Sequence, residues 1–154
     1  MKAIFFFSIL LFASLLTMAQ IDFSGNWKIN NSKSTLNADF SMAPNELVIK
    51  QSDSILTVER HANFQGENVT FTDKIYLDGK ESINNGWMDS KKKSVASWSA
   101  DKASLKISTK IPMDGGDEMS LTETYQLEGA MLKIVTKASS SWGENSETYL
   151  FDKQ

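Results

Sequence analysis

The chain contains no cysteine, one histidine and only two prolines among its 154 residues. Without cysteine it cannot form disulfides or thiolate metal sites, and no lipid can be attached through an N-terminal cysteine. One imidazole combined with carboxylates makes a poor zinc site, and no glycine-rich phosphate-binding loop is present. We therefore expect neither a bound metal nor a cofactor.

The single histidine also argues against nucleophilic catalysis. A Ser-His-acid triad needs an imidazole to accept the serine proton, and His61 is the only candidate. In an alternating strand with Leu56 and Val58 pointing inward, His61 points outward. Because the sequence also lacks a Gly-x-Ser-x-Gly motif, we expect a binding or structural protein and not a hydrolase.

Long apolar runs are missing after residue 20. The first segment, MKAIFFFSILLFASLLTMAQ, has one positive charge at Lys2, an apolar run from Ala3 to Leu16 and small residues up to Ala19. This order is typical of a secretory signal peptide, and the run is shorter than the roughly 20 residues of a membrane span. We expect residues 1–19 to be a signal peptide cleaved after Ala19. Residues 20–154 should form one soluble domain that is periplasmic or secreted.

The charge of the mature chain limits its partners. Loss of Lys2 with the signal peptide changes the formal net charge from −3 to −4. A negative chain is poorly suited to bind nucleic acids or anionic membranes by long-range attraction. The run Lys91-Lys92-Lys93 is a local exception, which we interpret as a solvated strand start or a sheet edge protected by lysines.

Beyond the first segment, the chain is rich in strand formers. Val, Ile, Thr and aromatic residues recur in short alternating runs separated by turns such as Asp78-Gly79-Lys80, and no convincing helix is present. The irregular segment Asn31–Asn45 contains Pro44 and a short helical turn over residues 31–36. The expected strands are Phe23–Asn30, Glu46–Ser52, Ile55–Ala62, Asn68–Leu77, Glu81–Asn84, Trp87–Met88, Ser94–Ser99, Ser104–Ile111, Met119–Leu127, Met131–Ala138 and Glu147–Asp152. The pattern predicts an all-β fold, a single antiparallel up-and-down barrel of about 8–10 strands or a sandwich.

Three charged residues interrupt otherwise apolar strand faces. Alternation places Arg60, Asp73 and Glu123 on faces that also carry Phe71 and Tyr125. An isolated buried charge is too costly to persist, so these groups must pair, meet water or meet a polar ligand. They form a structural salt bridge, or a bulge turns one of them to solvent, or they are the polar end of a mostly apolar cavity.

The cavity interpretation assigns candidate ligand-binding residues. Arg60 suits a ligand carboxylate, because its planar guanidinium can bind two oxygens at once. Asp73 and Glu123 would orient Arg60 or bind a hydroxyl, with Phe71 and Tyr125 beside them. Two alternatives remain. Asp73 and Glu123 could act as an acid-base pair in an enzyme, or the barrel could be solid and act as an interaction module of the cell envelope, with Asn31–Asn45 as its contact surface.

The stretch DFSGNWKIN and the Lys-Ser that comes after it resemble the N-terminal signature of the calycins, the superfamily of lipocalins and fatty-acid-binding proteins. More closely, the chain resembles a group of secreted bacterial lipocalin-like proteins. The shared motifs are Phe23–Lys28, Lys33-Ser34, Asp78–Glu81, Thr122–Leu127 and Phe151–Gln154.

This resemblance implies an antiparallel barrel that binds a small hydrophobic molecule, such as a lipid or fatty acid. Gly25 and Trp27 are its structural signature: the glycine should let a neighbouring segment approach while the tryptophan packs near the barrel floor. The chain lacks disulfide cysteines and a clear C-terminal helix. A lipocalin closure and a ten-stranded closure like that of fatty-acid-binding proteins therefore both remain open.

Overall fold

The computed structural model describes residues 19–154 except residues 65 and 87–89. The described chain forms ten strands and one short 3₁₀ turn, Asp114–Gly116. The strands are β1 (Gly25–Ile29), β2 (Glu46–Gln51), β3 (Ile55–Phe64), β4 (Glu67–Tyr76), β5 (Ser82–Asn85), β6 (Lys91–Trp98), β7 (Ser104–Pro112), β8 (Glu118–Glu128), β9 (Met131–Ser140) and β10 (Gly143–Lys153).

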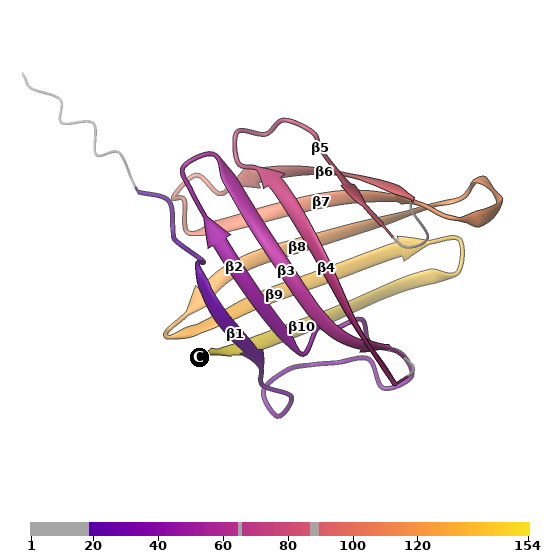
Figure 1. Cartoon of the computed structure of the whole chain (residues 1–154), viewed down its shortest axis with the longest axis horizontal. Coiled ribbons are helices and arrows are strands. Elements are labelled where there is room, and N and C mark those ends of the chain that lie inside the picture. Colours follow the sequence, from indigo (N-terminus) through magenta and orange to yellow (C-terminus); the bar gives the residue numbers. More distant parts are fainter. Residues whose placement is uncertain (1–18, 65, 87–89) are drawn as a thin grey trace, which may run out of the picture.

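All ten strands belong to one antiparallel sheet in the order β4-β3-β2-β1-β10-β9-β8-β7-β6-β5. The first strand pairs with the last, with Trp27 opposite Lys153 and Ile29 opposite Phe151. Figure 1 shows β1–β4 crossing in front of β6–β10, so the sheet curls back over itself. This is the up-and-down barrel that the sequence predicted, and not a sandwich of two separate sheets.

The barrel is closed between β4 and β5 by side chains. The side-chain amide of Asn84 makes the two hydrogen bonds that the backbone of a neighbouring strand would otherwise make with Lys74. Its Oδ1 accepts from the Lys74 amide at 2.9 Å, and its Nδ2 donates to the Lys74 carbonyl at 3.0 Å. The Ser82 hydroxyl accepts from the Tyr76 amide at 2.8 Å. These bonds satisfy backbone groups that would otherwise be unpaired at a sheet edge.

Several predicted boundaries needed correction. The run Lys91-Lys92-Lys93 belongs to β6, and β10 begins at Gly143, four residues before the predicted start. The short helical turn predicted within residues 31–36 is present as a single turn, in which the amides of Lys33 and Ser34 both donate to the Asn30 carbonyl at 3.2 and 3.0 Å. The predicted strand Trp87–Met88 and residues 1–18 of the predicted signal peptide lie outside the described residues.

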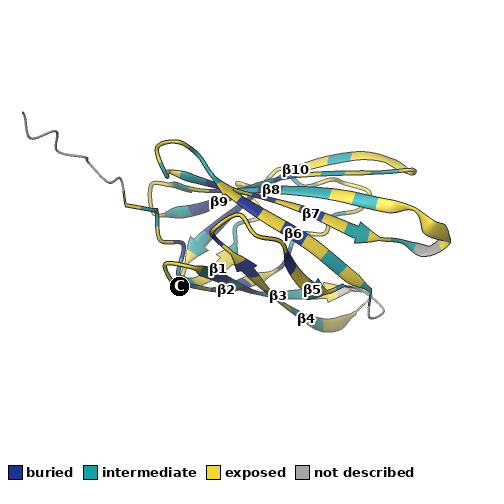
Figure 2. Ribbon diagram, turned by 90° about the horizontal axis from the view of Figure 1, so that it is seen from above, coloured by how far each residue is buried: buried dark blue, intermediate teal, exposed yellow. Residues whose placement is uncertain are grey.

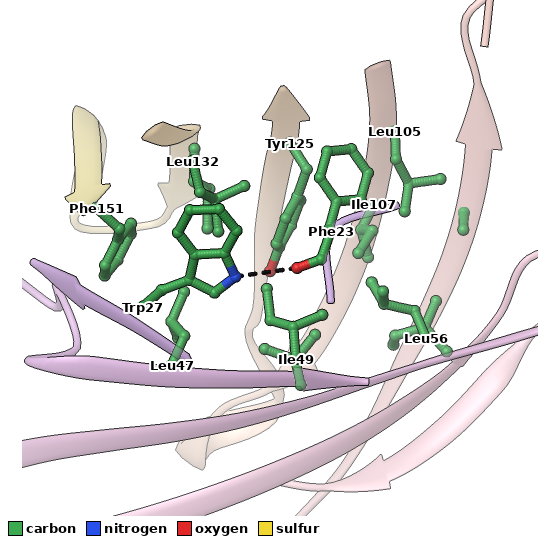
Figure 3. Close-up of a cluster of buried hydrophobic side chains, with 14 of the residues drawn as sticks. Phe23, Trp27, Leu47, Ile49, Leu56, Leu105, Ile107, Tyr125, Leu132 and Phe151 are labelled. Atoms are coloured by element: carbon green, nitrogen blue, oxygen red, sulfur yellow. Dashed lines mark hydrogen bonds between the residues drawn. The ribbon is translucent and has the colours of Figure 1, made fainter. Parts of the chain in front are cut away.

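The apolar core fills one end of the barrel. Trp27 from β1 is 2% exposed, and its indole Nε1 donates to the Phe23 carbonyl at 3.0 Å. Phe23 stacks on Trp98 with a centroid separation of 6.0 Å. Figure 3 shows Trp27 and Phe23 surrounded by side chains from both halves of the sheet, including Leu47, Ile49, Leu56, Leu105, Leu132 and Phe151. We call this the closed end.

Gly25 is required at the closed end. Its φ is +149°, a conformation that L side chains rarely adopt. A Cβ at this position would lie 2.9 Å from Lys153 Cε and 3.3 Å from Trp27 Nε1. The absence of a side chain at Gly25 therefore leaves room for the Lys153 side chain, whose Nζ lies 5.3 Å from the centroid of the Trp27 ring.

The opposite end is more open. It is formed by segment 30–45 and by the tips of the β7–β8 and β9–β10 hairpins. Here the inward-facing apolar residues are only partly buried, and they include Ala62, Val69, Phe71, Ile111, Leu121 and Ala138. Figure 2 shows buried residues along the strands of both halves of the sheet and exposed residues toward the hairpin tips. Solvent therefore reaches the interior from this open end.

Candidate functional site

Arg60 is the centre of a polar cluster inside the barrel. Its Nη1 donates to Asp73 Oδ2 at 2.6 Å, and its Nη2 donates to both oxygens of Glu123 at 3.1 and 3.0 Å. The same Nη2 lies 3.0 Å from the Tyr125 hydroxyl. Lys92 adds a second cation, with Nζ 2.8 Å from Asp73. We call these five residues the Arg60 cluster.

The strand register explains how the cluster forms. Arg60 lies opposite Phe71, and Asp73 opposite Val58, so Arg60 and Asp73 are diagonal neighbours on the inner face of β3 and β4. Glu123 and Tyr125 come from β8, which lies in the other half of the sheet. The guanidinium therefore bridges the interior and ties the two halves together.

The cluster is mostly, but not fully, removed from water. The side chains of Asp73 and Glu123 are 7% and 11% exposed, and those of Arg60 and Lys92 are 19% and 16% exposed. Burial alone would favour the neutral form of Arg60, but Glu123, Tyr125 and Asp73 outweigh it and raise the Arg60 pKa. Burial also raises the pKa of Tyr125, which keeps its hydroxyl protonated at neutral pH.

A second polar contact connects the interior to segment 30–45. Glu147 on β10 is 3% exposed and accepts from the Asn37 amide at 2.8 Å and from the Tyr149 hydroxyl at 2.7 Å. Burial acts to raise the pKa of Glu147, but hydrogen bonds from Tyr149, Ser41 and the backbone of Asn37 and Met42 lower it overall. This carboxylate therefore holds residues 37–42 across part of the open end.

Neutral hydroxyl groups complete the polar part of the interior. Ser94 Oγ and Thr109 Oγ1 are buried and lie 2.8 Å apart. Thr136 is also buried, and its hydroxyl lies 3.5 Å from the Glu147 carbonyl. The inner surface thus changes from apolar at the closed end to polar and hydroxylated toward the open end.

The described surface also carries two shallow clefts outside the interior. One is lined by Ala19, Gln20, Asp22, Gln51, Ser52 and Asp53 near the start of the described chain. The other is lined by Ser120, Thr122, Lys137, Ala138, Ser139, Glu144, Asn145 and Ser146 on β8–β10. Neither is lined by a residue of the Arg60 cluster.

The predicted site residues fall into two groups. Arg60, Asp73, Glu123 and Tyr125 meet inside the barrel, and Phe71 lies beside Arg60 in the register. The signature residues Gly25 and Trp27 lie at the closed end, among the core residues. No bulge turns the three charges to solvent, so the salt-bridge interpretation of their pairing describes the observed contacts.

Two functional candidates escaped the sequence reasoning. The predicted strand began at Ser94, so Lys92 was interpreted as part of a solvated lysine run. The alternation of β6, continued back from Ser94, places Lys92 on the inner face. Glu147 shares an alternating face with Tyr149 and Phe151, which was the available signal. His61 does point outward, with Nε2 2.8 Å from Glu59 and Nδ1 3.1 Å from Thr70.

The two carboxylates proposed for acid-base catalysis both bind the guanidinium of Arg60. They approach it from β4 and β8, and neither lines one of the two clefts.

Within the described residues, no group of three or more His, Asp or Glu side chains is arranged to hold a metal ion. The described part of the chain also contains no helix that is both long and apolar enough to cross a membrane.

Comparison with known proteins places the fold in a class. The ten-stranded, antiparallel, up-and-down barrel is a fold like that of fatty-acid-binding proteins and lipocalins. No known family model matches the chain, and no curated protein sequence matches it.

Among solved structures, the chain is similar to zebrafish ileal bile acid-binding protein, crystallised in complex with cholic acid. The TM-score is 0.59 and the sequences are 18% identical, and the match covers 86% of this chain and 98% of the zebrafish chain. At this identity the likeness establishes the fold. The ten-stranded closure that the sequence left open is therefore the observed one.

Proposed function

We propose that this protein binds a small amphipathic molecule inside its barrel, in the part between the Arg60 cluster and the open end, which we call the outer half. The observation that carries the proposal is the gradient along the inner surface. Half-buried apolar side chains, among them Phe71, Ile111 and Leu121, lie on the open side of a polar cluster that water can reach. Ligand sites combine apolar walls with a few polar groups that fix orientation.

The closed end is filled by the protein's own core, so we do not expect a ligand to bind there. We therefore expect the polar group of the ligand to lie at the Arg60 cluster and its apolar part to lie between the cluster and the open end. The similarity to a bile acid-binding protein supports this proposal at the level of the fold.

The test uses a neutral fluorescent probe, N-phenyl-1-naphthylamine, whose emission rises in apolar surroundings. We expect saturable binding to the purified protein. Replacing the inward, half-buried Ala62 by Phe should fill the outer half and weaken binding by about tenfold. The matched control is His61→Phe on the outer face of the same strand, which should leave binding unchanged. Absence of saturable binding to the unmodified protein would overturn the proposal.

We also propose that the protein is exported. The support is the charged, apolar and small-residue order of residues 1–19. Among the residues that the structure describes, the first with a long-range backbone hydrogen bond is Ile21, whose amide donates to the Lys102 carbonyl at 3.2 Å. Cleavage after Ala19 would therefore leave the anchored chain intact.

A second candidate function is that of an interaction module. Its support is the set of exposed apolar side chains in segment 30–45 and the β9–β10 turn: Phe40 and Met42 are 56% exposed and Trp142 is 85% exposed. Exposed apolar groups are typical of contact surfaces when they gather. A barrel that binds no amphipathic probe but co-purifies with one envelope protein, and releases it on Trp142→Ser, would favour this function.

A further inference from the structure

We infer that the polar group of the bound molecule is a hydrogen-bond donor without negative charge, a hydroxyl or an amine, and not a carboxylate. This inference rests on the proposed function and names the ligand class for the same site. It replaces the sequence-based expectation that Arg60 binds a ligand carboxylate.

The first argument is the charge of the inner surface. The inward-facing charged side chains that are mostly removed from water are, among the described residues of β3–β10, two cations, Arg60 and Lys92, and three carboxylates, Asp73, Glu123 and Glu147; Lys153 and Glu67 alternate onto the same face but are exposed. Their formal sum is therefore negative. Interactions between charges are strengthened where water is largely excluded, and both cations of the cluster already pair with carboxylates, so the cluster offers an anionic ligand no net positive charge.

The second argument is that the hydrogen-bond donors of Arg60 and Lys92 are already bound to acceptors within the cluster. Arg60 Nη1 donates to Asp73, and Nη2 donates to Glu123 and lies within hydrogen-bond distance of Tyr125. Lys92 Nζ contacts both oxygens of Asp73. A ligand carboxylate offers only acceptors. It would have to displace an internal carboxylate from these cations and leave that carboxylate buried without its partner.

The third argument is the acceptor capacity that remains. Each carboxylate oxygen can accept about two hydrogen bonds. Glu123 Oε2 accepts from Arg60 Nη2 at 3.0 Å, and Oε1 accepts from the same nitrogen at 3.1 Å and from Tyr125 at 3.4 Å. The Glu123 side chain is 11% exposed, so solvent reaches it. A ligand hydroxyl or ammonium group can bind there without disturbing the ion pairs.

The experiment compares three ligands of equal chain length as competitors of N-phenyl-1-naphthylamine at neutral pH. They are dodecanoate, dodecylamine and 1-monododecanoylglycerol, each used below its aggregation concentration. We expect the amine and the glycerol ester to displace the probe at concentrations about tenfold lower than dodecanoate. Equal or tighter binding of dodecanoate would overturn the inference while leaving the proposed function standing. If the probe itself shows no saturable binding, the proposed function fails, and the inference fails with it.

Glu123→Gln gives a second readout. The amide keeps the shape of the side chain and removes one negative charge, so dodecanoate should gain about tenfold in affinity relative to the glycerol ester. The control is Glu128→Gln, an exposed residue of the same strand that pairs with Lys133 at 3.0 Å, which should leave the ranking unchanged. An unchanged ranking in Glu123→Gln would contradict the inference. If that variant does not fold, the ranking in the unmodified protein decides the question.

Discussion

Arg60 holds two carboxylates that come from different halves of the barrel. Removing its side chain would leave Asp73 and Glu123 in a mostly buried place, with Lys92 as the remaining cation. Breaking a buried ion pair by deleting one partner is strongly destabilising, because the surviving charge is no longer compensated. We expect Arg60→Ala to lower the free energy of unfolding by about 3 kcal/mol, measured by urea denaturation.

The matched control is Lys28→Ala. Lys28 pairs with Glu46 at 3.9 Å, and both side chains are more than half exposed. Exposed pairs contribute roughly 0–1 kcal/mol, so this variant should unfold close to the unmodified protein. A loss below about 1 kcal/mol for Arg60→Ala would show that the cluster adds little to stability.

At the level of single residues, alternation predicted most of the candidate site. A period of two placed Arg60, Asp73 and Glu123 on inner faces, because neighbouring side chains of a strand point to opposite sides. Lys92 was missed because the predicted strand began at Ser94, whereas pairing of Lys91–Lys93 with the preceding strand β5 extends β6 by three residues. The pairing of Arg60 with Glu123, 63 residues apart, required the barrel itself.

Segment 30–45 is an element whose conformation depends on a distant strand. The Thr35 amide and carbonyl both pair with Thr148, and the Ser34 hydroxyl accepts from the Leu150 amide at 3.0 Å. Glu147 then holds residues 37–42. Because these partners lie more than 100 residues along the chain, the sequence predicted an irregular segment with Pro44 but not its path.

Acid should release the part of segment 30–45 that Glu147 holds. The folded-state pKa of Glu147 is lowered below its ordinary value of 4.5. Its stabilising contribution is therefore fully present above the unfolded-state pKa and is lost as the pH falls through the folded-state pKa. The groups that face this carboxylate are Tyr149 and Ser41, with the amides of Asn37 and Met42. We expect the hydrogen-exchange protection factor of the Asn37 amide to fall on acidification below the ordinary glutamate pKa.

The Thr35 amide serves as the internal reference, because it donates to a backbone carbonyl, that of Thr148, at 2.8 Å. Its protection should change less over the same pH range. Glu147→Gln should remove most of the pH dependence at Asn37, whereas the exposed Glu144→Gln should retain it. Equal loss of protection at Asn37 and Thr35 would contradict the assignment to Glu147.

At the scale of the whole molecule, closure joins the two ends of the described chain. The amide of Gln154 donates to the Asn26 carbonyl at 2.9 Å, and β1 pairs with β10. Short alternating strands are local features and predicted a barrel or a sandwich, and the resemblance that includes Gly25-x-Trp27 implied the barrel. Whether its interior is solid or hollow was not predictable, because that depends on how side chains from all ten strands pack.

Closure also makes the residues just before β1 decisive for stability. Phe23 precedes β1, is fully buried, stacks on Trp98 and packs against Tyr125 with a centroid separation of 5.9 Å. A chain that begins at Gln20, as cleavage after Ala19 would leave it, keeps Ile21 and Phe23. A chain that begins at Ser24 loses both, along with the carbonyl that accepts from the Trp27 indole.

We therefore expect residues 20–154 to unfold cooperatively in urea, and residues 24–154 to be less stable by about 3–5 kcal/mol, the cost of deleting a buried aromatic side chain. Phe23→Ala in the longer chain separates the side chain from the truncation and should account for most of this loss. Tryptophan fluorescence should report the change, because Trp98 would lose the ring that stacks on it. Similar stability of the two chains would mean that the core at the closed end does not depend on Phe23.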